Sequence, residues 1–104
     1  MIRDSKKLVA YLEPTIGNVF KILPLYETNN VGVDVYVESL LFEFYGWERS
    51  ISVGESYEYI ALVSNLESIK EVVKDEDRKP IVKREVFKCI NIIKTMVEKL
   101  EEGE

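Results

Sequence analysis

The sequence predicts an all-α protein, a small helical bundle of four helices, built as a single domain over residues 1–104. Two observations lead to this prediction. Apolar residues recur at spacings of three and four along most of the chain, which is the period of one face of a helix. The chain also has the length of one domain, and no shift in composition marks a boundary within it. A chain of this length buries on the order of 65% of the surface that its unfolded form exposes, so it needs no metal or disulfide to fold.

The first helix is expected to begin near Asp4 and Ser5, which are residue types that cap helix N-termini. Pro14 predicts a kink or a break near Glu13, and Pro24 is expected to end the helix. Its apolar stripe comprises Leu8, Leu12, Ile16, Val19, Phe20 and Leu23.

The second segment, residues 31–48, has two interpretations. The alternation of apolar and polar residues in VGVDVYV is typical of a strand, and a hairpin could pair residues 31–37 with residues 40–44 around Glu38 and Ser39. Helical spacings of four, three, four and three instead connect Val33, Val37, Leu40, Phe44 and Trp47. We favour the helix, because Glu-Ser is a poor two-residue hairpin turn. An α+β arrangement with a central hairpin at residues 31–45 remains the alternative.

The third helix is expected to begin at Ser52, because Ser52 and Glu55 match a capping box. Glu67 with Lys70, and Glu71 with Lys74, have the spacing of local ion pairs on a helix surface. The apolar stripe of this helix comprises Tyr59, Leu62, Leu66, Ile69 and Val73, with Val63 beside it.

The last helix has the clearest pattern, and Pro80 suits its first turn. We interpret Cys89 as a small apolar filler of its buried seam rather than as a reactive thiol. Residues 101–104 offer nothing to bury and are expected to fray. The seam comprises Val82, Val86, Cys89, Ile93, Met96 and Leu100, thickened by Ile90 and Val97.

The chain contains no histidine, which excludes Ser-His and Cys-His nucleophile systems and the usual histidine-containing metal sites. Its five glycines are isolated, so no glycine-rich phosphate loop is present. We therefore expect a protein that is not an enzyme and that has no cofactor. A metal site built from carboxylates alone remains an open alternative.

The N-terminal stretch MIRDSKKLVAYLEP is interrupted by charge, so we expect no signal peptide and a cytoplasmic protein. No run approaches the roughly 18 apolar residues of a spanning helix, so no membrane partner is expected. The net charge of −5 argues against a nucleic-acid partner and favours a basic protein partner. One basic cluster departs from the acidic character of the chain: Arg78, Lys79, Lys83, Arg84 and Lys88. The neighbouring carboxylates of Asp75, Glu76 and Asp77 are expected to offset its charge.

Acidic residues gather in the middle third of the chain, where only Arg49 opposes them. They form either a solvated face or a surface that steers a cationic partner. The seven carboxylates are those of Glu27, Asp34, Glu38, Glu43, Glu48, Glu55 and Glu58.

The second helix carries more apolar residues than one buried stripe requires, namely Val35, Leu41, Phe42 and Tyr45. Either this helix is central and buried from several sides, or it presents an aromatic patch to a partner or to a second copy of the chain.

Our leading hypothesis for function is an acidic interaction protein that binds and masks or inhibits a partner protein, by analogy with immunity proteins, antitoxins and phage-encoded inhibitors. The alternative is a homodimeric structural or regulatory subunit whose second-helix patch is buried between two copies. In the leading hypothesis, steering is assigned to Asp34, Glu38, Glu43 and Glu48, and anchoring to Phe42, Tyr45 and Trp47.

Overall fold

The computed structural model describes residues 2–28, 31–47, 57–75 and 77–102, with the side chains of residues 2–7 and 47 outside this description. The described residues form helices and turns and contain no strand. The predicted all-α bundle is therefore confirmed, and the hairpin at residues 31–45 is not formed. The helices are α1 (Ile2–Phe20), α2 (Ile22–Glu27), α3 (Val33–Trp47), α4 (Tyr57–Val72) and α5 (Lys79–Glu102).

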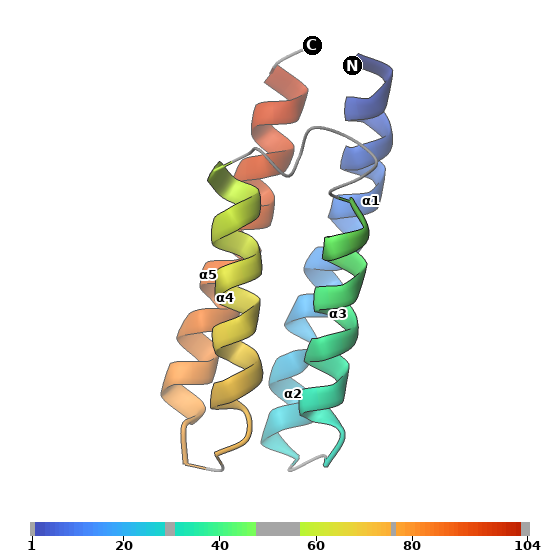
Figure 1. Ribbon diagram of the computed structural model, residues 1–104. Coiled ribbons are helices and arrows are strands. Elements are labelled where there is room, and N and C mark those ends of the chain that lie inside the picture. Colours follow the sequence, from blue (N-terminus) through green and yellow to red (C-terminus); the bar gives the residue numbers. More distant parts are fainter. Residues whose placement is uncertain (1, 29–30, 48–56, 76, 103–104) are drawn as a thin grey trace.

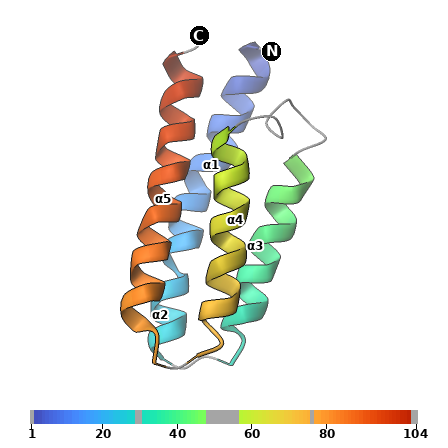
Figure 2. The ribbon, with the colours of Figure 1, turned by 60° about the vertical axis from the view of Figure 1, so that its left-hand side comes forward.

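The five helices make four arms, because α2 continues the course of α1 toward the far end of the bundle (Figure 1). Successive arms run in opposite directions, which places the N- and C-terminal ends at the same end of the molecule. Helix α5 packs against both α1 and α4, while α3 packs against α4 and α2 (Figure 2). The result is an elongated bundle measuring 43 × 22 × 20 Å.

The core lies along the bundle axis and receives apolar side chains from all five helices. The seam predicted for the last helix is confirmed, since Val82, Val86, Cys89 and Ile93 are fully buried in α5. Leu100, at the end of that seam, is only partly buried. Among the described residues, none of the helices is both long and apolar enough to cross a membrane.

The break expected near Glu13 does not occur, because α1 continues through Pro14. A proline inside a helix costs about 3 kcal/mol, since it leaves the carbonyl four residues earlier without its usual donor. The ring of Pro14 is exposed, while Leu12, Thr15 and Val19 on either side of it are buried. Packing of this stripe against the core on both sides of Pro14 therefore outweighs the local cost.

The helix is interrupted instead at Lys21, and Pro24 is the physical reason. Pro24 cannot donate to the carbonyl of Phe20, so the hydrogen-bond ladder loses a rung at the end of α1. The expectation that Pro24 ends the helix is wrong, because α2 extends through it to Glu27. The amide of Thr28 donates to the Pro24 carbonyl at 3.1 Å, which closes the last turn.

Tyr26 ties α2 to the connection between α4 and α5. Its buried hydroxyl accepts a hydrogen bond from the amide of Arg78 at 3.0 Å and donates one to the carbonyl of Asp75. Arg78 directly precedes α5, so this contact satisfies one of the amides that a helix N-terminus leaves without a helical partner. One side chain thus fixes the course of the chain into α5.

Two further tyrosines connect α3 to its neighbours through backbone carbonyls. The hydroxyl of Tyr36 donates to the carbonyl of Asn18 in α1 at 2.7 Å. The hydroxyl of the buried Tyr59 in α4 donates to the carbonyl of Phe44 at 3.0 Å. These bonds hold α3 between α1 and α4 and fix which of its sides faces outward.

Two local expectations concern the ends of α4 and α5. The capping box of Ser52 and Glu55 lies outside the described residues, in which α4 begins at Tyr57. The helical part of the C-terminal tail is longer than expected, because α5 continues through Glu102.

Candidate functional site

The inner side of α3 supplies part of the core. Val37 and Phe44 are fully buried, and Val33 and Leu40 are nearly so. Leu41 is also buried, with 4% of its surface exposed, so it belongs to the core rather than to a surplus surface. The buried side of this helix is therefore wider than the predicted seam.

The outer side of α3 carries a second row of apolar residues, which we call the α3 outer stripe: Val31, Val35, Phe42 and Tyr45. Val35 and Phe42 are 63% and 64% exposed, and Tyr45 is 40% exposed. Val31 extends this stripe in the turn that precedes α3. The rings of Phe42 and Tyr45 meet edge to face, with their centroids 6.3 Å apart. The aromatic pair of Phe42 and Tyr45 thus lies on the surface of the bundle.

Carboxylates lie beside and within the outer stripe, since Glu38 falls three residues after Val35 and four before Phe42. No lysine or arginine occurs within residues 33–47. Asp34, Glu38 and Glu43 are all partly exposed. Glu38 lies on the side of α3 that faces α4, because it contacts a lysine of that helix. Glu43 lies on the other side, close to Tyr36, which contacts α1. We call Asp34, Glu38 and Glu43 the acidic rim.

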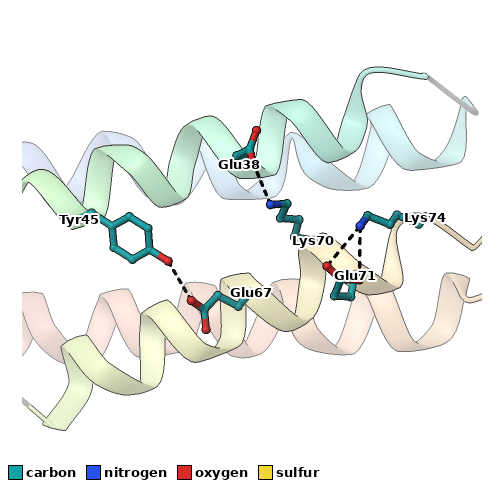
Figure 3. Close-up of polar contacts among 6 residues, drawn as sticks. All are labelled: Glu38, Tyr45, Glu67, Lys70, Glu71 and Lys74. Atoms are coloured by element: carbon teal, nitrogen blue, oxygen red, sulfur yellow. Dashed lines mark hydrogen bonds and ion pairs between the residues drawn. The ribbon is translucent and has the colours of Figure 1, made fainter.

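Glu38 is partly neutralised by an ion pair with Lys70 of α4. The ammonium nitrogen of Lys70 lies 2.9 Å from a carboxylate oxygen of Glu38 (Figure 3). This hydrogen bond raises the pKa of Lys70, against a smaller opposing effect of burial. Lys70 was expected to pair with Glu67 on its own helix, and the closer carboxylate from α3 takes that place. The acidic rim therefore has one charge already compensated within the molecule.

Tyr45 is oriented by Glu67, which Lys70 leaves available. The hydroxyl of Tyr45 donates to a carboxylate oxygen of Glu67 at 2.8 Å, across the α3–α4 seam (Figure 3). This bond to an ionised carboxylate raises the pKa of Tyr45, and partial burial adds to the effect. The exposed side chain of Tyr45 is thus oriented before any partner binds.

The expected ion pair of Glu71 and Lys74 is formed at 3.3 Å on the surface of α4.

Glu43 lies close enough to Tyr36 to affect the pKa of its hydroxyl. Burial raises the pKa of the Tyr36 hydroxyl, and the negative charge of Glu43 raises it further. Acidic groups therefore lie on both sides of the outer stripe, toward α1 and toward α4. The remaining two residues proposed from the sequence are not placed, because Glu48 and the side chain of Trp47 lie outside the described part of the chain.

The described residues contain no group of three or more histidine, cysteine, aspartate or glutamate side chains that could hold a metal ion. Burial raises the pKa of the Cys89 thiol to about 12. A thiol is nucleophilic only as the thiolate, so Cys89 is inert at neutral pH in the folded protein.

Sequence reasoning missed one buried polar contact between α4 and α5. Asn65 is 5% exposed, and its amide nitrogen donates to Glu85 at 2.7 Å, while its amide oxygen has no hydrogen-bond partner. The spacing of three from Leu62 would have placed Asn65 on the apolar stripe. The contact nevertheless lies in the interior of the seam and gives no indication of a reaction.

Comparison with known protein families, with characterised proteins and with solved structures finds no match to this chain. The exposed faces of the molecule are therefore the guide to its function.

Proposed function

We propose that this chain is a non-enzymatic interaction protein, which binds a partner protein through the α3 outer stripe and thereby masks or inhibits it. The observation that carries the proposal is the exposed pair of Phe42 and Tyr45 on a helix whose only charges are acidic. Aromatic residues at the centre of an apolar patch commonly supply most of the binding energy of an interface.

The outer stripe contributes little to folding. Because Val35 and Phe42 remain more than half exposed, most of their apolar surface stays in water in the monomer. Each Å² removed from water on binding stabilises a complex by roughly 25 cal/mol, before the costs of association. The ordered ring of Tyr45 lowers one of those costs, since Glu67 already restricts its rotation.

The acidic rim defines the chemistry of the partner. A partner that presents apolar side chains flanked by lysine or arginine would bury its apolar groups on Phe42 and place its cations beside Asp34 and Glu43. An amphipathic helix with basic flanks has this arrangement, and it would lie along α3 in the manner of helix-in-groove recognition. Opposite charges across such an interface accelerate encounter and exclude acidic competitors.

The same charges disfavour a symmetric dimer formed through α3. A two-fold axis brings the same surface of each copy together, so the acidic rim of one copy would face the acidic rim of the other. Like charges in contact oppose association. We therefore prefer a different, basic partner to a second copy, and we expect light scattering to report a monomer over a wide concentration range.

A direct test uses two synthetic helical peptides with the same leucine face, one flanked by lysines and the other by glutamates. The lysine-flanked peptide should bind, measured by fluorescence anisotropy, and the glutamate-flanked peptide should not. Phe42→Ser should weaken binding at least about tenfold, which corresponds to 1.4 kcal/mol. Phe87→Ser is the matched control, because Phe87 is also an exposed phenylalanine in edge contact with one other ring, but on α5.

Equal losses from Phe42→Ser and Phe87→Ser would overturn the proposal, as would equal binding of the two peptides. The masking role is tested in the native setting by affinity capture with the unaltered chain and with the Phe42→Ser variant. A partner retained only by the unaltered chain should lose its own activity when the protein is added. An unchanged partner activity would contradict inhibition.

A further inference from the structure

An open groove of about 470 Å³ lies between the outer sides of α4 and α5, away from α3. Its volume is within the range of roughly 300–1,000 Å³ that small-molecule sites occupy. Along α5 it runs from Arg84 to Thr95, which at 1.5 Å per residue is about 16 Å of helix.

Four apolar side chains line the groove. They belong to Tyr57 and Ala61 of α4 and to Phe87 and Ile92 of α5. Phe87 is 41% exposed, and its ring packs edge-on against Phe20 of α1 with the centroids 6.2 Å apart. This ring contact joins α5 to α1 beside the groove.

Hydrogen-bond donors and cations form an edge of α5 that runs between Phe87 and Ile92, because Arg84 lies three residues before Phe87 and Lys88 lies four before Ile92. Arg84 and Lys88 lie four residues apart on α5, so they are neighbours on the helix surface and repel each other. Arg84 contacts Glu85 at 3.3 Å, whereas Lys88 has no ion-pair partner among the described residues. Asn91 continues the same edge with an exposed amide.

The groove keeps a positive charge in a chain whose net charge is −5. Among the described residues that line it, the only carboxylate is that of Glu58, which Lys99 neutralises at 2.5 Å. Two other cations of the basic cluster are paired elsewhere, since Arg78 contacts Asp75 at 3.6 Å and Lys79 contacts Glu27 of α2 at 3.2 Å. Among the described residues, Arg84 therefore has Glu85 alone as an anionic partner, and Lys88 has none.

We propose that this groove binds an amphiphilic organic anion, with its carboxylate at Arg84 and Lys88 and its apolar body along Phe87, Ile92 and Tyr57. Cations set between apolar side chains match a ligand with a charged head and a hydrocarbon body, and they would discriminate against the neutral analogue of that ligand. The inference is independent of the α3 outer stripe, which lies on another face of the bundle.

The experiment is a titration of the isotope-labelled protein with decanoate and with its neutral analogue decanamide, followed by NMR. Decanoate should shift amide signals in residues 57–61 and 84–95 and leave those of α3 unchanged. Decanamide, which has the same hydrocarbon body, should bind at least tenfold more weakly because it lacks the charge.

Substitutions separate this site from general charge effects. Replacing both cations (Arg84→Gln with Lys88→Gln) should weaken decanoate binding about tenfold and leave decanamide binding unchanged. The matched control is Lys83→Gln with Lys94→Gln, which removes the same two charges from exposed positions of α5 outside the groove. Phe87→Ser should weaken the binding of both ligands, whereas Phe42→Ser should affect neither.

Several outcomes would overturn the proposal: equal affinity for decanoate and decanamide, an equal loss in the control pair, or signal shifts on α3. Binding of a glutamate-flanked helical peptide in the groove, without binding of decanoate, would also overturn it in favour of an acidic protein partner. Because Phe42→Ser reports only on α3 and Phe87→Ser only on the groove, failure of one proposal is distinguishable from failure of the other.

Discussion

Phe44 and Phe42 stand two residues apart on α3, yet one is fully buried and the other is 64% exposed. The inner side of the helix, with Phe44, is held by packing and by the hydrogen bond from Tyr59 to the Phe44 carbonyl. On the outer side, the ring of Phe42 meets the ring of Tyr45 edge to face, and most of its surface is exposed to water. Phenylalanine thus forms part of the core on one side of α3 and lies on the surface on the other. Apolar content alone therefore does not identify the core residues of this bundle.

The largest expected effect concerns the inner side. Phe44→Ala should lower the free energy of unfolding by about 3–5 kcal/mol, because it leaves a cavity in the core. Phe42→Ala should change it by less than about 0.5 kcal/mol, as is usual for an exposed site. Urea denaturation followed by circular dichroism measures both. If Phe44→Ala does not fold, Phe44→Leu should still lower the free energy of unfolding by about 1–2 kcal/mol. Similar losses of stability at positions 42 and 44 would contradict the assignment of Phe44 to the core and of Phe42 to the surface.

Cys89 offers a second measure of how closed the interior is. Burial raises the pKa of its thiol to about 12 from an ordinary value of 9.0. Between these values the unfolded chain has lost the thiol proton and the folded chain keeps it, so rising pH favours unfolding. The free energy of unfolding should fall by up to about 1.4 kcal/mol per pH unit on this account.

The control is Cys89→Ala, which shares every other titrating group with the unaltered chain. As the pH rises from 9 to 11, the free energy of unfolding of the unaltered chain should therefore fall relative to that of Cys89→Ala. Parallel pH profiles of the two proteins would show that the Cys89 environment is wetter than the structure indicates.

Two tyrosine hydroxyls sharpen the contrast further. Tyr26→Phe removes two hydrogen bonds in a buried site and should cost about 1–2 kcal/mol of stability, given about 1 kcal/mol for each bond. Tyr45→Phe removes one bond at an exposed site and should cost about 0.5 kcal/mol or less. Thermal unfolding of the two variants at one pH gives the comparison. A larger loss of stability for Tyr45→Phe than for Tyr26→Phe would show that the outer side of α3 contributes to folding.

The smallest effect is expected for Lys70→Gln, which removes the cation paired with Glu38. Both side chains are substantially exposed, so stability should hardly change. The acidic rim would, however, gain one uncompensated charge, and the lysine-flanked peptide should associate faster at low salt. High salt should remove this gain, because it screens exposed charges. Slower association of the variant would contradict steering by the acidic rim.

Helical spacing alone predicted the bundle and most of its core. The clearest case is α5, whose apolar residues occupy one side, so that Val82, Val86 and Ile93 could be assigned to the core from the sequence. On α3, apolar residues occur all around the helix, and spacing could not decide that Leu41 is buried while Phe42 is exposed. That distinction depends on where α2 and α4 pack against α3.

Other features depended on contacts between distant residues. The pairing of Lys70 with Glu38 rather than Glu67 follows from the approach of α3 to α4, which no local rule contains. Continuation of α1 through Pro14 likewise depends on core packing around Leu12 and Val19. The groove between α4 and α5 contains Arg84 and Lys88, which the sequence shows as part of a basic cluster. The apolar side chains beside them come from both helices, and only the fold brings these together.

The central claim, that the outer side of α3 is a binding surface, is tested most directly by NMR of the labelled protein with the lysine-flanked peptide. The proposal predicts that amide signals of residues 31–46 shift, most strongly around Val35, Phe42 and Tyr45, while those of the α4–α5 groove stay in place. Shifts confined to any other face, or none at concentrations where the peptide is helical, would contradict it.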